Sequence, residues 1–183
     1  MSIALEDINR LDRLITDISD ASRLDSDLSK DEMININLTS LIDGFITIRK
    51  EMIKGVQFKL NLEKDLFISG NESRLIQVFD NLVNNSVSFS PKDGEIKIDA
   101  LKIRGKIHVI ISDQGSGIPV GKEDTIFDRF YSDRPSNEKF GKHSGLGLSI
   151  VKQILASHKA KIYADNIYHR NKNIKGAKFT IIF

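Results

Sequence analysis

The stretch DQGSGIP at residues 113–119 decides how the rest of the chain is arranged. It follows a β-branched run at residues 106–112, which predicts a strand. A second glycine-bearing stretch, SGLGLSI at residues 144–150, opens a segment with helical apolar spacing. The glycines let backbone amides approach a ligand closely, and a helix N-terminus attracts anions. The order strand, long loop, helix therefore indicates a phosphate-binding site.

Two familiar phosphate-binding motifs do not fit these glycines. A Walker loop ends in Gly-Lys-Ser or Gly-Lys-Thr, whereas Gly141 and Lys142 are followed by His143. A dinucleotide fingerprint needs a third glycine, but Val120 and Ile150 stand at the corresponding positions. The glycines therefore match neither of these two motifs.

The composition predicts one cytosolic domain with a sizeable core and a small appendage. The chain has 183 residues, of which 40% are hydrophobic. Its 27 Lys and Arg nearly balance its 25 Asp and Glu, which gives no case for a nucleic-acid surface. It contains no Cys, so disulfides and thiolate chemistry are excluded. No apolar run approaches the roughly 20 residues that span a bilayer.

The first 30 residues predict one long helix with a stripe of coiled-coil type, wide enough for a bundle. We expect it to pack against partner helices, although it could instead fold back on its own domain. Its apolar residues are Leu5, Ile8, Leu11, Leu14, Ile15, Ile18, Ala21, Leu24 and Leu28.

The remaining pattern predicts an α/β two-layer sandwich, in which three helices cover one face of a mixed sheet of about five strands. Thr39 or Ser40 is expected to cap a helix that runs to about residue 54, and Asn71 to cap a helix over residues 72–89. The expected strand pairs are hairpins of residues 56–62 with 66–69, 95–102 with 106–112, and 161–166 with 175–183; a short strand near residues 31–38 precedes them.

Asn81 and Asn85 lie four residues apart, and hence on one face of the predicted helix. Two amide oxygens beside an anion site suit a hard cation that already carries phosphates, which points to Mg²⁺. Taken alone, two helical asparagines are more often surface or capping residues. The metal interpretation therefore depends on the neighbouring glycine loops.

Asp113 ends an apolar strand, where a carboxylate needs a hydrogen-bond donor. The exocyclic amine of adenine could supply it, and guanine presents an acceptor oxygen at that position, so the carboxylate would select ATP over GTP. The alternative is an Asp that only caps the Asp-x-Gly turn.

The segment between the glycine stretches is expected to form a lid. Phe127 and Phe130 are apolar residues that could clamp it, and the surrounding cations could neutralise phosphate charge or simply be solvated. The cations are Arg129, Arg134, Lys139, Lys142 and His143. The four histidines lack metal-ligand spacing and are expected to be structural or exposed.

Four motifs resemble, in order and spacing, the boxes of sensor histidine kinases. They are NLVNN at residues 81–85 with FSP at residues 89–91, DQGSGIP at 113–119, FDRFY at 127–131 and SGLGL at 144–148. GAKF at residues 176–179 is similar to the last glycine box of that family. Residues 9–25 are similar to the second helix of its dimerisation and phosphoacceptor hairpin.

The resemblance implies the fold of gyrase, Hsp90 and mismatch-repair ATPases, with residues 31–183 as the ATP-binding domain and residues 119–143 as its lid. Asn81 and Asn85 would be catalytic residues that hold Mg²⁺, and Asp113 would meet the adenine amine. Phe89 and Ile118 would flank the adenine. The other nucleotide-binding residues implied are Gly115, Gly117, Phe127, Arg134, Lys142, Ser144, Gly145, Leu146 and Gly147. The hydrolysing relatives place a Glu where Asn81 stands, and an amide cannot act as that base.

The chain departs from the family pattern in three places. Ser88 stands where the family often has Lys, so a lid residue such as Arg134, Lys139 or Lys142 must meet phosphate charge. Lys159-Ala160 replaces a usual Gly-Gly turn. The first hairpin helix with its phosphoaccepting His is missing, so we expect that residues 1–183 cannot phosphorylate themselves.

The sequence therefore predicts a histidine kinase catalytic domain that binds MgATP and transfers the γ-phosphate to a histidine on a dimerisation helix. A response regulator would receive the phosphoryl group next, in two-component signalling. The full-length protein would be a homodimer, with this part on the cytosolic side of an inner-membrane sensor and no nucleic-acid or membrane contact. The alternatives are a nucleotide-binding regulator without kinase activity, a serine-directed kinase of the anti-sigma type, and an ATP-hydrolysing clamp.

Overall fold

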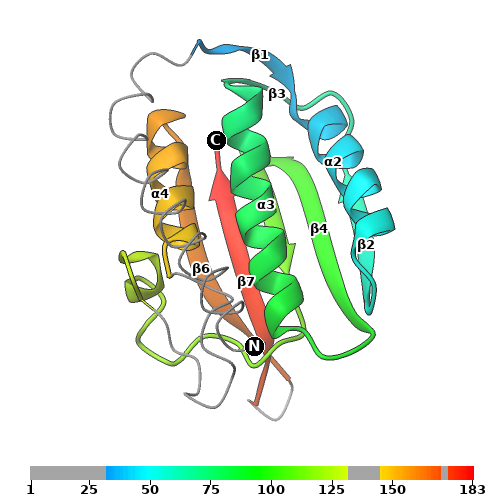
Figure 1. Ribbon diagram of the computed structural model, residues 1–183. Helices are drawn as coiled ribbons and strands as arrows, with labels where there is room; N and C mark the ends of the chain where they lie inside the picture. Colours follow the sequence, from blue (N-terminus) through cyan, green and yellow to red (C-terminus); the bar gives the residue numbers. More distant parts are fainter. Residues whose placement is uncertain (1–31, 132–144, 170–172) are drawn as a thin grey trace, which may run out of the picture.

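A five-stranded sheet covered by helices on one face forms the body of the protein (Figure 1). The structure is a computed structural model, and it describes residues 32–131, 145–169 and 173–183. The predicted N-terminal helix lies outside the described residues. Figure 1 shows α3 in the middle of the helix layer, with α4 on one side of it and α2 on the other. The predicted two-layer architecture is confirmed.

The sheet is mixed, and its strand order is β2-β4-β5-β7-β6. β2 (Val56–Leu62) runs parallel to β4 (Gly94–Ile103), and every other neighbouring pair is antiparallel. β5 (Lys106–Ser112) has the predicted bounds. β4 with β5, and β6 (Lys161–Tyr168) with β7 (Ile174–Ile182), form the two predicted hairpins.

The predicted hairpin of residues 56–62 with 66–69 is wrong. β3 (Phe67–Gly70) pairs instead with β1 (Ile34–Asn37) in a separate two-stranded antiparallel sheet, where Ile36 lies opposite Ile68 and both side chains are buried. The chain leaves the main sheet at Asp65, which adopts a positive φ of 57°. Alternation of apolar residues sets which face of a strand is buried, but it does not encode the partner strand.

The start of α2 (Leu38–Met52) also differs from the prediction. Asn37 caps this helix, because its Oδ1 accepts a hydrogen bond from the Ser40 N–H at 3.1 Å. The Thr39 hydroxyl instead donates to the Glu63 carbonyl oxygen at 2.7 Å and accepts from the Leu66 N–H at 3.3 Å. Thr39 therefore ties α2 to the connection between β2 and β3.

α3 (Glu72–Phe89) has the predicted bounds and the predicted cap, since Asn71 Oδ1 accepts from the Arg74 N–H at 3.1 Å. Apolar character alone does not set burial on this helix, since Ile76 is exposed whereas Ser86 is buried. α4 (Gly147–Ser157) packs beside α3. The fully buried side chains on these helices and on the facing strands include Leu75, Leu82, Val151, Ile154, Ile98, Val109 and Ile181.

The buried His158 joins the start of α3 to the end of α4. His158 Nε2 accepts a hydrogen bond from the Asn71 N–H at 3.0 Å, so Nδ1 carries the proton and donates to the Ile154 carbonyl oxygen at 2.8 Å. His158 is thus structural, as expected. The start of α3 is held against the end of α4.

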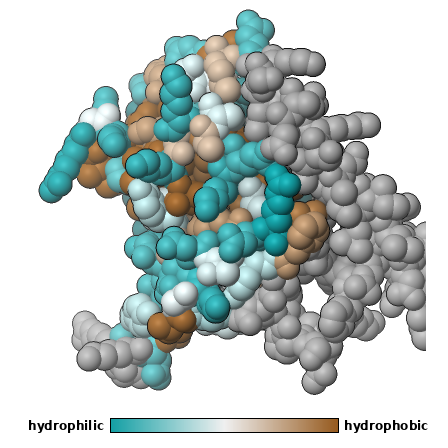
Figure 2. All heavy atoms as spheres, turned by 90° about the vertical axis from the view of Figure 1, so that its left-hand side faces the viewer, coloured by the Kyte–Doolittle hydropathy of each residue, from teal (hydrophilic) through white to brown (hydrophobic). Residues whose placement is uncertain are grey.

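The face shown in Figure 2 is mixed in character. Hydrophilic and hydrophobic residues lie side by side on its described part. In the described ranges, no helix is both long and apolar enough to cross a membrane.

Candidate functional site: a nucleotide-binding site

Asp113 is fixed by its own loop and by β7. Its carboxylate is buried, and Oδ1 accepts hydrogen bonds from the Gly115 N–H at 2.9 Å and from the Ala177 N–H at 3.1 Å. The Asp113 N–H in turn donates to the Ala177 carbonyl oxygen at 3.0 Å. The bond to Gly115 is the turn-capping geometry of the alternative interpretation. Both backbone donors meet Oδ1, which leaves Oδ2 as the oxygen that can accept from a ligand.

Burial raises the pKa of the Asp113 carboxyl above its ordinary value of 3.8. The hydrogen bonds from Ala177 and Gly115 oppose this rise, and the nearby Ser86 hydroxyl opposes it as well. That hydroxyl falls short of hydrogen-bond geometry, and the buried Ser86 Oγ has no partner among the described residues. A donor from a ligand would relieve the cost of the buried charge.

Gly176 makes the close approach of β7 to Asp113 possible. A Cβ at this position would collide with the Asp113 carbonyl oxygen. A Cβ at Gly115 would lie 2.7 Å from the Phe89 carbonyl oxygen, so the loop packs directly on the last residue of α3. Phe89 itself is 37% exposed. The loop after β5 therefore lies in contact with both α3 and β7.

Asn166 on β6 holds the far end of the same loop. Its Oδ1 accepts from the Ile118 N–H at 2.6 Å, and its Nδ2 donates to the Ile118 carbonyl oxygen at 2.7 Å. Gly117, with a positive φ of 79°, lies so close to Asn166 and Ile174 that neither leaves room for a Cβ. The Ile118 side chain is buried.

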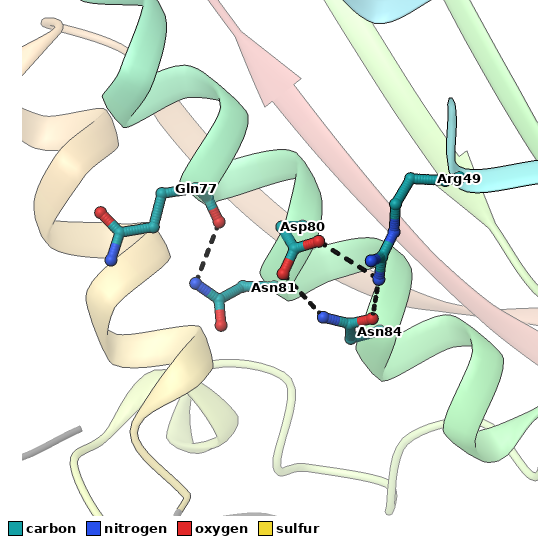
Figure 3. A network of polar contacts seen from close by, with 5 residues as sticks. All are labelled: Arg49, Gln77, Asp80, Asn81 and Asn84. Carbon is teal, nitrogen blue, oxygen red and sulfur yellow. Dashed lines mark hydrogen bonds and ion pairs between the residues drawn. The ribbon is translucent and has the colours of Figure 1, made fainter. Parts of the chain in front are cut away.

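The predicted metal ligand Asn81 lies on the α3 face that is turned toward α4, and Asn85 follows it by about one helical turn. Asn81 Nδ2 donates to the Gln77 carbonyl oxygen at 3.0 Å (Figure 3). This leaves Oδ1 beside the start of α4, because a Cβ at Gly147 would lie 2.9 Å from it. Within the described residues, no hydrogen bond engages the Asn85 side chain, whose backbone oxygen accepts from the Ser88 hydroxyl at 2.9 Å. Both amides keep an oxygen for a ligand.

A separate polar network fixes α3 from the side of α2 (Figure 3). Arg49 on α2 forms an ion pair with Asp80 at 3.2 Å and donates to Asn84 Oδ1, while Asn84 Nδ2 donates to Asp80 at 2.8 Å. Asp80 and Asn84 each precede a predicted metal ligand by one residue. The helix is therefore held on the side of α2, and Asn81 points away from this network.

The described first part of the predicted lid is tied to the core. The short 3₁₀ helix η1 (Thr125–Phe127) buries Phe127, whose ring packs edge-on against Phe179 with centroids 6.5 Å apart. Lys152 Nζ lies 5.8 Å from the centroid of the same ring. Phe130 contributes through its backbone, since its N–H donates to the Gly145 carbonyl oxygen at 3.0 Å while its side chain is 64% exposed. Gly145 has a positive φ of 73°.

The described structure brings together most of the predicted site residues along the α3–α4 side of the loop after β5. Leu146 is buried, and Gly147 is the first residue of α4. Arg134, Lys139, Lys142, His143 and Ser144 lie outside the described residues. Among the residues that the structure describes, no three or more His, Asp or Glu side chains gather as a metal site.

Sequence reasoning missed Asn166 and Ser86 as parts of this site. Asn166 sits in an alternating strand, where its pattern is that of any half-buried position. Ser86 shares a helix face with Leu82 and Val83, and only its burial near Asp113 gives it a role. The sequence signal for Ser86 was a polar residue on an apolar helix face.

These features together define a class of ATP-binding fold. They are a mixed sheet, a covering helix with paired asparagines, and a buried carboxylate at a strand end. Residues 70–183 match the family described as "Histidine kinase-, DNA gyrase B-, and HSP90-like ATPase". The chain belongs to this family.

The similar proteins are sensor kinases. The chain is 38% identical to the Sensor protein ChvG of Rhizobium meliloti (strain 1021) over 99% of its own length, and it spans 33% of the length of that relative. Among solved structures, a mycobacterial sensor histidine kinase, MprB, matches with a TM-score of 0.71 and 25% identity over 82% of this chain and 96% of that one. Histidine kinase ThkA in complex with response regulator protein TrrA matches in fold, with a TM-score of 0.75 and 24% identity over 99% of this chain and 49% of that one.

Proposed function

We propose that this chain is the catalytic domain of a sensor histidine kinase, which binds MgATP and transfers its γ-phosphate to a histidine on a dimerisation helix. The observation that carries the proposal is the buried Asp113 carboxylate, with Oδ1 anchored by two backbone donors and Oδ2 left for a ligand. Family membership and the sensor-kinase relatives support it. Residues 31–183 would form this domain and residues 1–30 the second helix of the hairpin.

In this proposal, Asp113 recognises the adenine base. Oδ2 accepts a hydrogen bond from the exocyclic amine, and the guanine oxygen at the same place would face a carboxylate instead. Ile118 in the same loop and Phe89 at the end of α3 would flank the base, and Gly115 lets the loop come close to Phe89. The base end therefore supplies selectivity for ATP.

Mg²⁺ fits the two amides of α3. Asn81 Oδ1 and the Asn85 side chain are the uncommitted oxygens of this face, and neutral oxygens suit a hard cation shared with phosphates. The metal ion would neutralise charge that develops on the transferred phosphoryl group. Gly145, Leu146 and Gly147 would present the start of α4 to the phosphates together with Ser144, and Arg134 and Lys142 would complete the site from the predicted lid.

The reaction would rely on placement and charge rather than on a base. The accepting imidazole is already a nucleophile, and in-line transfer requires mainly orientation and neutralisation. Asn81 cannot deprotonate water, which favours transfer over hydrolysis. A response regulator would be the next acceptor, and the full-length protein would act as a dimer on the cytosolic side of the membrane, where ATP is available.

The test is a titration followed by a transfer assay. Calorimetry should show heat for MgATP and at least about tenfold weaker binding of MgGTP, because the hydrogen bond to Asp113 is reversed. Labelled ATP with a separate hairpin that carries the acceptor histidine should give an acid-labile phosphoprotein. An acid-stable product would indicate a serine kinase, and binding without any product would indicate a regulatory module.

A further inference from the structure

We propose that Asn166 is a positioning residue for the base pocket, and that the β6–β7 hairpin sets the spacing between Asp113 and Ile118. This inference rests on the proposed ATP-binding function and names a residue to which the function does not assign a role. It starts from the two hydrogen bonds by which one side chain holds both backbone groups of Ile118, 48 positions away in sequence.

The two ends of the loop after β5 are anchored at one rung of this hairpin. Asn166 lies opposite Ala177 in the β6–β7 register. The Ala177 N–H donates to Asp113 Oδ1 at 3.1 Å, and the Asp113 N–H donates to the Ala177 carbonyl oxygen at 3.0 Å. The Asn166 side chain holds Ile118. A single pair of facing residues therefore fixes both the carboxylate and the apolar residue that would meet the base.

The contact leaves little freedom for the loop between these anchors. A Cβ at Gly117 would lie 2.5 Å from Asn166 Oδ1, and the backbone there has a positive φ. Because the Asn166 amide accepts from the N–H of Ile118 and donates to its carbonyl oxygen, it holds the peptide groups on both sides of this residue and fixes the orientation of its backbone as well as its distance. Loss of either bond would let Ile118 turn relative to Asp113.

An Asn166→Asp variant tests this point because its bonding depends on pH. The ionised carboxylate can still accept from the Ile118 N–H, but it has lost the donor to the Ile118 carbonyl oxygen and repels it. The protonated carboxyl restores one donor and one acceptor, as in the amide. At pH 7.5 we expect about tenfold weaker binding of MgADP than in the wild type, which corresponds to one or two lost hydrogen bonds.

The decisive readout is the ratio of the MgADP dissociation constants of the variant and the wild type, measured from pH 7.5 down to pH 5 at a temperature at which both are folded. If Asn166 positions the loop, this ratio falls toward one as the pH falls, and Asn166→Ala stays weak at every pH. A role limited to stability would lower the melting temperature and leave the ratio near one throughout, which would overturn the inference.

Asp165→Asn is the matched control, since Asp165 is the neighbouring residue on β6 and pairs with Lys178 at 3.4 Å rather than with the loop. It should leave the MgADP dissociation constant unchanged, and an equal loss in this variant would also contradict the inference. The wild-type titration separates the two hypotheses: if the wild type binds no nucleotide, the proposed function fails; if the wild type binds and the ratio stays at one, only the role of Asn166 fails.

Discussion

The two ends of the candidate site are built differently. At the base end, Asp113 and Ile118 are held by five hydrogen bonds to β6, β7 and their own loop. At the phosphate end, Asn81 has one hydrogen bond to its own helix, and the Asn85 side chain has none within the described residues. The base end is thus prepared before a ligand arrives. The side chains at the phosphate end keep their oxygens for ligands.

This difference indicates how the binding free energy should be divided. Preformed groups lose little conformational freedom when a ligand binds, so selectivity for the base should be sharp and insensitive to metal. Groups that are completed by metal and phosphates should respond to the metal concentration. Variants at the two ends should therefore differ in what they change, and the following three tests are ordered by expected effect.

The largest effect is expected for Asp113→Asn. The amide can still accept from Gly115 and Ala177, but it presents a donor in place of Oδ2, so MgATP should bind about a hundredfold more weakly. Calorimetry with and without Mg²⁺ should give the same loss, because the defect lies at the base end. Unchanged affinity would contradict the adenine contact and the comparison built on it.

Asp113→Asn should affect stability differently from affinity. Because the folded-state pKa of Asp113 is raised, its carboxyl favours the folded state most below pH 3.8, and that contribution is lost as the pH rises through the folded-state pKa. At neutral pH the substitution removes a buried charge and should cost no stability. Asp99→Asn is the control: Asp99 is buried and paired with Lys97 at 2.7 Å, so this change should lower the melting temperature and leave nucleotide binding intact.

An intermediate effect is expected for Asn85→Asp, which adds a negative charge on α3 about one helical turn after Asn81. Binding of ATP should weaken about tenfold at low Mg²⁺ and recover in part as Mg²⁺ is raised, since the metal ion offsets the repulsion. Asn84→Asp adds the same charge one residue earlier, where the side chain contacts Arg49 and Asp80. It should leave the metal dependence unchanged. Equal metal dependence in both variants would show that Asn85 is not a ligand.

The smallest effect is expected for Gly147→Ala. The new Cβ would lie 2.9 Å from Asn81 Oδ1, and this side chain can shift, so the fold should survive while the amide turns away from the site. We expect about threefold weaker MgATP binding and no change for adenosine, which lacks phosphates. Gly44→Ala, in an open position on α2, should raise stability and leave both affinities unchanged. Weaker adenosine binding would contradict the division into two ends.

The sequence predicted the elements of this fold better than their partners. The bounds of α3 and β5 followed from apolar period, the Asn71 cap and the turn after Phe89, all of which are local signals. The partner of β2 could not be derived from the sequence. The next strand, β3, pairs with β1 instead, and the hydrogen bond between Thr39 and Leu66 that accompanies this pairing joins residues 27 positions apart. Long-range pairing is decided by packing rather than by local pattern.

The residues of the candidate site show the same limit: local signals could be read from the sequence, and long-range contacts could not. Asp113, Asn81 and Asn85 could be proposed from the sequence because their residue types are unusual for a strand end and an apolar helix. Asn166 was not found, since its function depends on a loop 48 positions away and its strand pattern is ordinary. The exposed Phe130 side chain shows the converse: its hydrogen bond to Gly145 is made by the backbone, so the side-chain type gives no sign of this contact.

Gly176 bears on how relatives of this chain can diverge. A Cβ at this position would collide with the Asp113 carbonyl oxygen, so even alanine would force the backbone apart beside the carboxylate. Gly44 faces open space and carries no such restriction. An inventory of tolerated mutations should therefore find glycine alone at position 176 and many residue types at position 44, whatever signal each kinase has evolved to detect.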